Sequence, residues 1–558
     1  MQSSKNKYEY DRSTLENFIN QYLEALSKND PSGLPLANGV KFVENNQELQ
    51  TGDGTWNTVT GLGVYRHYFV DLLTGQSAVI CVVEENGRNV ILNLRLKISN
   101  GKISEIESLV VRDSNGAENY EKLGQPPSLF LATIPEERRK PRESLIGTAN
   151  LYFSGMEYND PKGDYSFFAD RCNRMENGRI TSNAEPTEYG HSTDSDFVTM
   201  SCREQFETGF LGFVTRIRDR RFFVIDEECQ SVISFAYFDH DGTIRKIDMP
   251  NDKTFVIPPY FSTPRTLQVC EAFRVENEQL QFIEVTMTEL PYGTRPKWDT
   301  EKDQWLRKSN SMNTDDSQKA DGSMGRDQLN SFVDQFLVAL VSRDVRPHGI
   351  ADSVKYTENG QQLDIGDGLW GTASEIGEYK VVLAEPETGS VGFFGCIKEY
   401  DVDSFLTVRL KIQNGEIIEI EALVMRNEYF DERLGTVTLF GPRLEGLYKR
   451  KNSTDLPGVF GQILPPNERI DTRVMMSIVQ EKRVNIREQH TLITDVEYGL
   501  LLEMIFSDVP NPNTGPVDPA CSGPYSIMRS QLHKIRGHNI VKTKSIIMPV
   551  PYQMRRGW

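Results

Sequence analysis

The stretch ENNQELQTGDGTW, residues 44–56, occurs a second time as ENGQQLDIGDGLW, residues 358–370. The offset of 314 residues between these two copies holds on both sides of the stretch, and it aligns residues 15–112 with residues 329–426 without an insertion or a deletion. Self-similarity over such a length is the signature of a repeated structural unit. We conclude that the chain contains an internal duplication.

The segment that follows each copy also repeats, but its offset falls. Arg218 and Asp226 match Arg487 and Asp495 at 269, and Pro291-Tyr292 matches Pro551-Tyr552 at 260. The fall from 314 to 260 means that the second copy of this segment is shorter by 54 residues. We therefore predict unit A1 (residues 12–125), unit B1 (126–305), a polar linker (306–326), unit A2 (327–436) and a shortened unit B2 (437–558).

Composition narrows the class of protein. Hydrophobic residues make up 38% of the 558, which is enough for folded cores. The 62 Lys and Arg against 80 Asp and Glu give a net charge of −18, which disfavours nucleic acid and membrane surfaces as partners. No apolar leader follows Met1, and the seven cysteines form no CxxC pair. We expect a cytoplasmic protein with reduced thiols.

The order of the predicted elements indicates an α+β fold. Apolar side chains at spacings of three and four over residues 15–26, behind Asp11, predict a capped helix. Asn100-Gly101 is a strong hairpin signal, and Asn414-Gly415 repeats it. In unit A1 we expect strands at 40–44, 78–84, 90–99 and 103–112. In unit B1 we expect helices at 145–153 and 204–215, then strands at 221–226, 232–239, 267–276 and 280–289.

This order resembles the nuclear-transport-factor-2-like (NTF2-like) fold and its SnoaL-like branch. The motifs that carry the resemblance are ENxxxLxxGxGxW, RLKI…GxIxEIE (residues 95–107 and 409–421), and in unit B1 Cys202-Arg-Glu-Gln-Phe and Pro291-Tyr292-Gly293. More specifically, the chain resembles fungal SnoaL-like proteins whose unit joins an A-type and a B-type segment. The resemblance implies tandem, internally duplicated cone domains, each with helices packed on a curved antiparallel sheet around one pocket.

Unit B1 offers the best candidates for catalysis. Asp226 and His240 end successive predicted strands, and Arg218 precedes them, so that a carboxylate, an imidazole and a guanidinium could move protons and stabilise an oxyanion. Glu271 is a candidate buried acid. No motif for a nucleotide, a metal or a catalytic triad is present, so no cofactor and no metal is implied.

Each candidate also has a structural alternative. The run RIRDRR (216–221) can be an ion-paired junction between a helix and a strand, and His240 can be an exposed strand end. Alternation puts Asp239 and His240 on opposite faces of their strand, so at most one enters a pocket. Glu105 and Glu107 are expected to pair across their hairpin with Arg95 and Lys97.

Aromatic residues at matched positions of the two copies are candidates for substrate binding, with the alternative that the tryptophans simply fill the cores. These candidates, with one arginine from unit B1, are Trp56, Tyr65, Trp370, Tyr379 and Arg221.

Three functions are open at this point. The resemblance implies a cofactor-independent lyase, isomerase or cyclase that uses acid–base catalysis on a hydrophobic small-molecule substrate in secondary metabolism. The alternatives are a non-catalytic ligand-binding or scaffold protein, and an epoxide or lactone hydrolase. We expect units A1 and B1, and units A2 and B2, to pair as intramolecular pseudo-dimers, with a homodimer of the whole chain as a further alternative.

Overall fold

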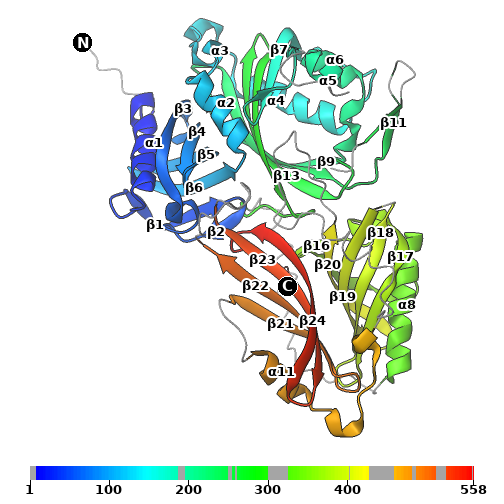
Figure 1. Ribbon diagram of the computed structural model, residues 1–558. Helices are drawn as coiled ribbons and strands as arrows, with labels where there is room; N and C mark the ends of the chain where they lie inside the picture. Colours follow the sequence, from blue (N-terminus) through cyan, green and yellow to red (C-terminus); the bar gives the residue numbers. More distant parts are fainter. Residues whose placement is uncertain are drawn as a thin grey trace.

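The computed structural model describes residues 8–185, 195–248, 250, 254–257, 261–298, 324–400, 402–426, 458–480, 486–510, 523–555 and 557. Over these residues the protein has a mixed α+β fold that is mostly sheet, with several strongly curved sheets and few helices (Figure 1). The predicted linker lies outside the described residues up to 323, and its last residue, Arg326, already begins a helix.

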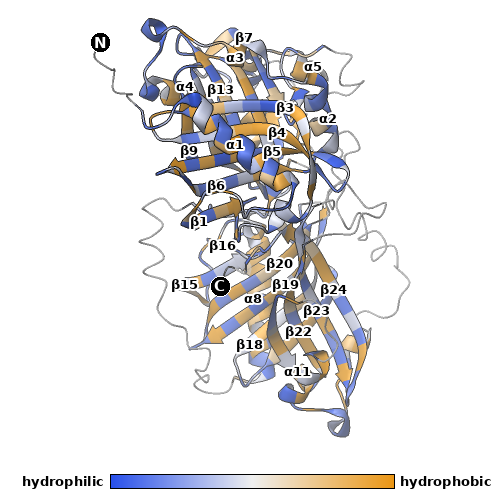
Figure 2. Cartoon of the chain, turned by 90° about the vertical axis from the view of Figure 1, so that its left-hand side faces the viewer, coloured by the Kyte–Doolittle hydropathy of each residue, from blue (hydrophilic) through white to orange (hydrophobic). Residues whose placement is uncertain are grey.

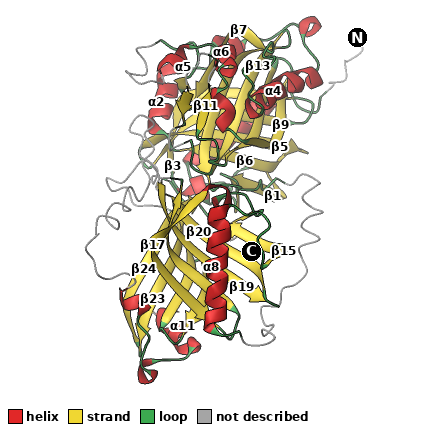
Figure 3. Ribbon diagram, turned by 90° about the vertical axis from the view of Figure 1, so that its right-hand side faces the viewer, coloured by secondary structure: helices red, strands yellow, loops and turns green. Residues whose placement is uncertain are grey.

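Units A1 and A2 contain the same strands in the same order, each preceded by one long helix. In unit A1 the elements are α1 (Arg12–Ser27), β1 (Leu36–Glu44), β2 (Gln47–Leu49), β3 (Val59–Asp71), β4 (Gln76–Glu85), β5 (Arg88–Ser99), β6 (Lys102–Val111) and α2 (Ser114–Leu123). In unit A2 they are α8 (Arg326–Ser342), β15 (Ile350–Glu358), β16 (Gln361–Leu363), α9 (Leu369–Thr372), β17 (Ala373–Glu385), β18 (Ser390–Glu399), β19 (Val402–Gln413) and β20 (Glu416–Arg426). Helix α8 lies along the sheet of unit A2 (Figure 3).

Units B1 and B2 differ in size. Unit B1 contains α3 (Ser128–Leu131), α4 (Arg142–Glu157), β7 (Phe168–Glu176), β8 (Arg179–Ile180), α5 (Ser195–Thr199), α6 (Cys202–Glu207), β9 (Arg216–Asp226), β10 (Ser231–His240), β11 (Lys246–Asp248), β12 (Thr254–Val256), β13 (Arg265–Glu276) and β14 (Gln279–Leu290). The described part of unit B2 contains α11 (Thr472–Gln480), β21 (Glu488–Asp495), β22 (Leu500–Val509), β23 (Tyr525–Arg536) and β24 (Asn539–Pro551).

Three of the sheets share one topology. Their strand orders are β2-β1-β6-β5-β4-β3, β8-β7-β14-β13-β10-β9 and β16-β15-β20-β19-β18-β17, whereas the sheet of unit B2 has four strands. The registers of units A1 and A2 agree residue by residue, because Lys41 opposes Glu105 and Lys355 opposes Glu419. The sheets are mainly antiparallel, as expected, but one pair in each six-stranded sheet is parallel, namely β1–β6, β14–β7 and β15–β20.

The stretch that repeats in the sequence forms a closed turn in both A units. Glu44 accepts hydrogen bonds from the backbone N–H of Thr55 at 3.2 Å and from its hydroxyl at 2.6 Å, and Glu358 accepts one from the N–H of Leu369 at 2.6 Å. Gly54 has φ of +66°, and a Cβ there would lie 2.6 Å from Glu44 Oε1. Glycine is therefore required beside the buried carboxyl. Burial raises the pKa of Glu44 to about 7.

Figure 2 shows apolar residues, in orange, along the strands, and strands such as β4 and β10 bury nearly every residue and therefore both faces. One face of the A1 sheet packs under α1, and the other packs against the sheet of unit B1, where β3 lies next to β9. A continuous apolar cluster joins Tyr65, Phe69 and Leu109 of unit A1 to Phe235 and Ala272 of unit B1. Units A2 and B2 share a corresponding cluster.

The Pro-Tyr segment after each B sheet joins the two halves of the chain. Tyr292 packs in the core of unit A2, and its hydroxyl donates a hydrogen bond of 2.5 Å to Asp367. Tyr552 packs in the core of unit A1, and the adjacent Gln553 donates one of 2.5 Å to Asp53. The Pro-Tyr segment of each half thus contacts the Gly-Asp-Gly turn of the other half. The C-terminus lies where the halves meet (Figure 1).

Replacing Tyr292 with phenylalanine tests this connection between the halves. The substitution removes a hydrogen bond to a partly exposed carboxylate, so we expect the free energy of unfolding to fall by about 1 kcal/mol. Thermal unfolding of the full chain measures the change. Tyr158→Phe, at a residue that is 76% exposed, is the matched control and should leave the stability unchanged. Equal melting temperatures for both variants would show that Tyr292 does not stabilise the junction.

Candidate functional site

Asp226 is held in an ion pair that both halves of the chain contain. Its carboxylate accepts from Arg12 of helix α1 at 2.6 Å and from the backbone N–H of Val70 at 3.1 Å. In the second half Asp495 binds Arg326 at 2.6 Å and the N–H of Ala384 at 3.1 Å. The same contact therefore connects the helix and the sheet of each A unit to its B unit. Asp226 has a structural role that does not depend on catalysis.

Arg218 is likewise part of a repeated contact. Its guanidinium donates to Asp239 at 2.7 Å, and Asp239 also accepts from the hydroxyl of Thr266 at 2.6 Å. Thr266 in turn accepts from the backbone N–H of Gly293, beside the Pro-Tyr segment. The second half repeats this series with Arg487, Asp508, Ser526 and Gln553.

The arginine run lies on strand β9 and not at a helix-to-strand junction. The expected helix at 204–215 ends at Glu207 and is followed by a short 3₁₀ turn, so the strand begins at Arg216. Arg220 binds Glu157 of α4 at 2.5 Å, and Arg221 binds Glu107 of unit A1 at 2.5 Å. These arginines are ion-paired, as the structural alternative predicted, and Arg221 joins the two units instead of facing a substrate.

His240 is buried within unit B1, whereas Asp239 faces the opposite side of the sheet, as alternation predicted. The ring packs against Phe213 and Phe261, and its Nδ1 atom makes no hydrogen bond within the described residues. Burial, aided by the charge of Arg265, lowers the pKa of His240 to about 3. A base this weak is poorly matched to proton abstraction near neutral pH.

The structure does not bring the predicted catalytic residues together. Asp226 opposes Ser231 at one end of strand β10, and His240 lies nine residues further along it. At about 3.3 Å per residue the two are about 30 Å apart. Glu271 opposes Ser234, which puts it about 20 Å from His240. Of the four candidates, Glu271 must be considered alone.

The predicted substrate-binding aromatic residues lie in cores or between units, and all but the half-buried Tyr379 are fully buried. Trp56 and Trp370 are 1% and 0% exposed and fill the interiors of units A1 and A2. Tyr65 donates a hydrogen bond of 3.0 Å to Glu284 across the interface of units A1 and B1. At the matching interface of the second half, the Nζ atom of Lys544 lies 3.8 Å from the centroid of the Tyr379 ring. Glu284 also contacts the Nδ1 atom of His67 at 2.7 Å.

Glu271 lies inside unit B1, between the sheet and helix α4. Its side chain is 1% exposed, and its Oε2 atom is buried without a hydrogen-bond partner in the described chain. Burial raises the pKa of Glu271 well above its ordinary value, and the nearby carboxylate of Glu176 adds to this effect. The environment of Glu271 therefore favours the neutral, protonated form of its carboxyl group.

Arg174 of strand β7 faces the same interior. Glu271 opposes Val285, and Val285 opposes Glu176, so Glu271 and the strand of Arg174 are two strand spacings, about 10 Å, apart. Arg174 binds Glu176 at 2.7 Å and Gln205 at 2.6 Å, while its Nη1 atom is buried without a partner. Burial opposes its charge, but the Glu176 carboxylate keeps the pKa of Arg174 above its ordinary value.

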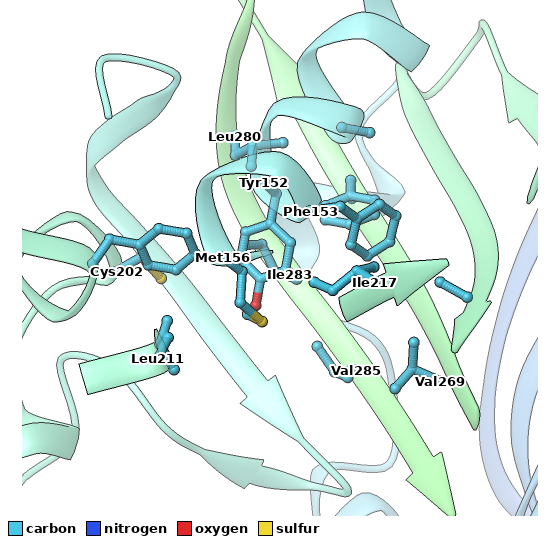
Figure 4. Packing of buried hydrophobic residues seen from close by; sticks show 14 of the residues in the cluster. Tyr152, Phe153, Met156, Cys202, Leu211, Ile217, Val269, Leu280, Ile283 and Val285 are labelled. Atoms are coloured by element: carbon cyan, nitrogen blue, oxygen red, sulfur yellow. The ribbon is translucent and has the colours of Figure 1, made fainter. Parts of the chain in front are cut away.

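Aromatic and sulfur-containing side chains complete this interior. Figure 4 shows Tyr152 and Phe153 of α4 lying over the strands of Val269 and Val285. The Tyr152 hydroxyl lies next to Arg174. Burial alone would raise the pKa of the Cys202 thiol, but hydrogen bonding with Cys172 and the charge of Arg174 lower it below its ordinary value.

We define the B1 site as Glu271, Arg174, Tyr152, Gln205 and Cys202. A neutral carboxylic acid, a guanidinium and a phenol are all hydrogen-bond donors, so the set suits a ligand oxygen that carries or develops negative charge. The aromatic walls suit an apolar ligand body. Sequence reasoning found only Glu271. The available signal for Arg174 was its spacing of two from Cys172, which places both side chains on one face of a strand.

The second half does not reproduce the B1 site. The offset of 260 places Gln531 at the position of Glu271, and Gln531 donates to Ser545 at 3.0 Å. The contacts of Asp226 and Arg218 repeat in both halves, whereas the buried acid Glu271 is specific to unit B1. This comparison within one chain separates structural ion pairs from candidates for chemistry.

The pH dependence of stability tests the buried acid. Because the folded-state pKa of Glu271 is raised, the folded protein binds more protons than the unfolded chain above about pH 4.3. Stability then falls as the pH rises towards the folded-state pKa, by at most about 1.4 kcal/mol per pH unit. Glu271→Gln lacks this loss, so its stability relative to the unmodified chain should increase with pH between about 5 and 7.

Urea unfolding at several pH values measures this difference, with Glu118→Gln, at an exposed helical position, as the control. Parallel pH profiles for the unmodified chain and Glu271→Gln would contradict a raised pKa at this residue.

Residues 9–110 and 138–287 are similar to a family described as a domain of unknown function (DUF8021). The match thus covers most of units A1 and B1. No curated protein matches the chain. Within the described residues, no group of three or more His, Cys, Asp or Glu side chains is placed to hold a metal ion.

Two solved structures show weak likeness. A de novo designed protein with a curved β-sheet is 18% identical, with a TM-score of 0.15, and the match covers 20% of this chain and 99% of that one. AusH from Aspergillus nidulans is 14% identical, with a TM-score of 0.17, and covers 30% of this chain and 96% of its own. At these scores neither likeness bears on function. In the described part of the chain, helices long and apolar enough to cross a membrane are absent.

Proposed function

We propose that the protein is a cofactor-independent acid–base enzyme that acts on a hydrophobic small molecule in the B1 site. The reaction class is that of a lyase, isomerase or cyclase, and the setting we propose is secondary metabolism. The proposal includes a fold of four NTF2-like cones made by duplicating an A–B pair, with unit B1 as the active cone. The matched registers of units A1 and A2 and the shared strand order of unit B1 support that assignment.

The single observation that carries the proposal is the buried Glu271 carboxyl, with its Oε2 atom unpartnered in the described chain, in an aromatic-walled interior. Keeping an acid at such a position costs stability unless a ligand uses it, because a buried polar group without a hydrogen bond is destabilising. Arg174 Nη1 is a second buried atom without a partner on the same interior. A ligand oxygen that accepts from both groups would satisfy them together.

In the proposed reaction Glu271 donates a proton to a substrate oxygen or carbon, and Arg174 and Tyr152 stabilise negative charge that develops on the substrate. The thiol of Cys202 lies near Arg174, whose charge favours a thiolate, so Cys202 is our candidate for accepting a proton. Gln205 holds Arg174 in place through its 2.6 Å hydrogen bond.

A non-catalytic ligand-binding protein is the second candidate. The observation that favours it is the separation of His240 from Glu271, which leaves the site without an imidazole base. A hydrolase of the epoxide or lactone type has less support, because Arg218 and Asp239 contact each other directly at 2.7 Å.

Comparison of metabolites among three strains of the source organism tests the proposal. The strains carry the unmodified gene, a deletion, and Glu271→Gln at normal protein level. We expect one compound to accumulate in the deletion strain and equally in the Glu271→Gln strain. Accumulation in the deletion strain alone would contradict a role for Glu271 in catalysis, and three identical profiles would contradict an enzymatic function in this setting.

A further inference from the structure

Unit B2 contains a hydrogen-bonded series of three side chains across strands β22, β23 and β24 (Figure 1). The hydroxyl oxygen of Thr543 lies 2.8 Å from Nδ1 of His533, and Nε2 of His533 lies 2.9 Å from Oε1 of Glu503. His533 and Thr543 are directly opposite each other in the sheet. The three groups are therefore fixed by the strand register itself.

The partners of His533 decide its tautomer. A carboxylate can only accept a hydrogen bond, so Nε2 carries the ring proton and donates it to Glu503. The other nitrogen, Nδ1, then has a free lone pair and accepts the hydroxyl hydrogen of Thr543. A carboxylate that orients an imidazole, which in turn accepts from a hydroxyl, is the arrangement that activates a nucleophile in serine hydrolases.

Unit B1 does not contain this series at the matching positions. The offsets of 260 and 269 place Phe273, Ile283 and Ser234 of unit B1 at the positions of His533, Thr543 and Glu503. Phe273 and Ile283 belong to the apolar core of unit B1 and are 0% exposed. An apolar pair stabilises a core at least as well as a hydrogen-bonded polar pair, so core stability does not explain the polar residues of unit B2.

Exposure increases along the series in the direction that a nucleophile requires. The side chain of Glu503 is fully buried, that of His533 is 7% exposed, and Thr543 is exposed on strand β24. The hydroxyl can therefore meet a substrate while the groups behind it are shielded from water. Gln531 lies on the same face, diagonal to Thr543; its amide donates one hydrogen to Ser545, and its second hydrogen is the candidate donor to an oxyanion.

We propose that unit B2 carries an acyl-transfer site with Thr543 as nucleophile, His533 as general base and Glu503 as the residue that positions the imidazole. The substrate class is a small carboxylic ester with a good leaving group. The Thr543 oxygen bonds to the carbonyl carbon, and its proton moves to His533. The ester C–O bond breaks, and the leaving alkoxide takes the proton from His533. Water then hydrolyses the acyl-threonine to a carboxylic acid and restores the hydroxyl.

Acetylation of the full chain by 4-nitrophenyl acetate tests the site. We expect release of 4-nitrophenolate with one acetyl group on Thr543, located by peptide mass spectrometry. Thr543→Ala removes an exposed hydroxyl, so the protein should fold normally and lose this label, whereas Thr543→Ser should keep it. His533→Phe, which installs the residue of unit B1, should slow labelling of Thr543 by about 100-fold, the usual contribution of a general base.

Thr254→Ala is the matched control, because the exposed Thr254 donates to a carboxylate, Asp248, at 2.7 Å without an imidazole. It should leave labelling of Thr543 unchanged. Circular dichroism and thermal unfolding establish that each variant is folded. Acetylation confined to lysines, or equal labelling of Thr543 in the unmodified chain and in His533→Phe, would overturn the proposal.

Discussion

Replacement of Asp239 by alanine is expected to lower the free energy of unfolding of the full chain by about 3–5 kcal/mol. The side chain of Asp239 is 0% exposed, and it is the shared acceptor for Arg218 at 2.7 Å and for the hydroxyl of Thr266 at 2.6 Å. Alanine leaves the largely buried Arg218 guanidinium with only the partly exposed Asp219, at 3.1 Å, as its counter-ion, and the loss of the buried acceptor is the main part of the penalty. Arg216 adds less, because it is 46% exposed.

Equilibrium unfolding in urea measures this loss, and Asp508→Ala in the second half is its matched control. Asp508 binds Arg487 at 2.8 Å, but their side chains are 19% and 26% exposed, so solvent screens the pair and the expected loss is about 1 kcal/mol. If both variants were as stable as the unmodified chain, the contact would not be structural, and Arg218 and Asp239 would return as candidates for catalysis.

The contribution of Asp239 to the free energy of unfolding also depends on pH in a defined direction. Burial opposes its charge, but its hydrogen bonds and ion pairs with Arg218 keep its pKa below the ordinary value. A carboxyl whose folded-state pKa is lowered stabilises the protein above its unfolded-state pKa of about 3.9 and loses this effect as the pH falls. This dependence is opposite in sign to that of Glu271.

Loss of activity in Glu271→Gln is the second large effect that we expect. Glutamine keeps the shape of the side chain but has no acidic proton to donate, and a positioned general acid contributes about 100-fold or more to a rate. On the compound that accumulates in the deletion strain, kcat should fall by at least about 100-fold with KM nearly unchanged, because the amide still forms hydrogen bonds.

Glu118→Gln is the control for this assay as well, because it changes an exposed carboxyl outside the B1 site. A Glu271→Gln variant with full kcat would contradict proton transfer by Glu271. A raised KM with an unchanged kcat would instead support the ligand-binding protein that we consider as the second candidate.

Local features of the fold were predictable from the sequence. Helix α1 begins behind its Asp11 cap, and the Asn100-Gly101 turn has the two positive φ values, 52° and 68°, that its hairpin needs. Arg95 pairs with Glu105 and Glu107 across the hairpin, as expected. These predictions succeeded because they depend on residues close together in the chain.

Strand β3 and the parallel pairing of β1 with β6 were missed. The sequence of β3 has glycine at 61 and 63, and its register with β4 is interrupted there, so it lacks a clean alternation. The parallel pair joins segments about 60 residues apart, a distance at which local pattern carries no information on pairing.

The site was predictable only in part. The sequence around Asp226 does not reveal its ion-pair partner, because Arg12 lies 214 residues away. Without a visible partner, Asp226 is a candidate catalytic residue. The repeat contained the correction, since Arg326 and Asp495 match the same two positions. A charged pair that recurs in a copy that has lost other features is better interpreted as structural. Glu271 has no such counterpart, and only the folded chain shows that Arg174 faces the same interior.

The central claim is that Glu271 is a neutral carboxylic acid inside unit B1 at the pH at which the protein works. The infrared difference spectrum between the unmodified protein and Glu271→Gln at neutral pH tests this claim most directly, and it needs no substrate. We predict that the difference contains the C=O stretch of one protonated carboxylic acid. A difference that contains only the bands of an ionised carboxylate would contradict the account.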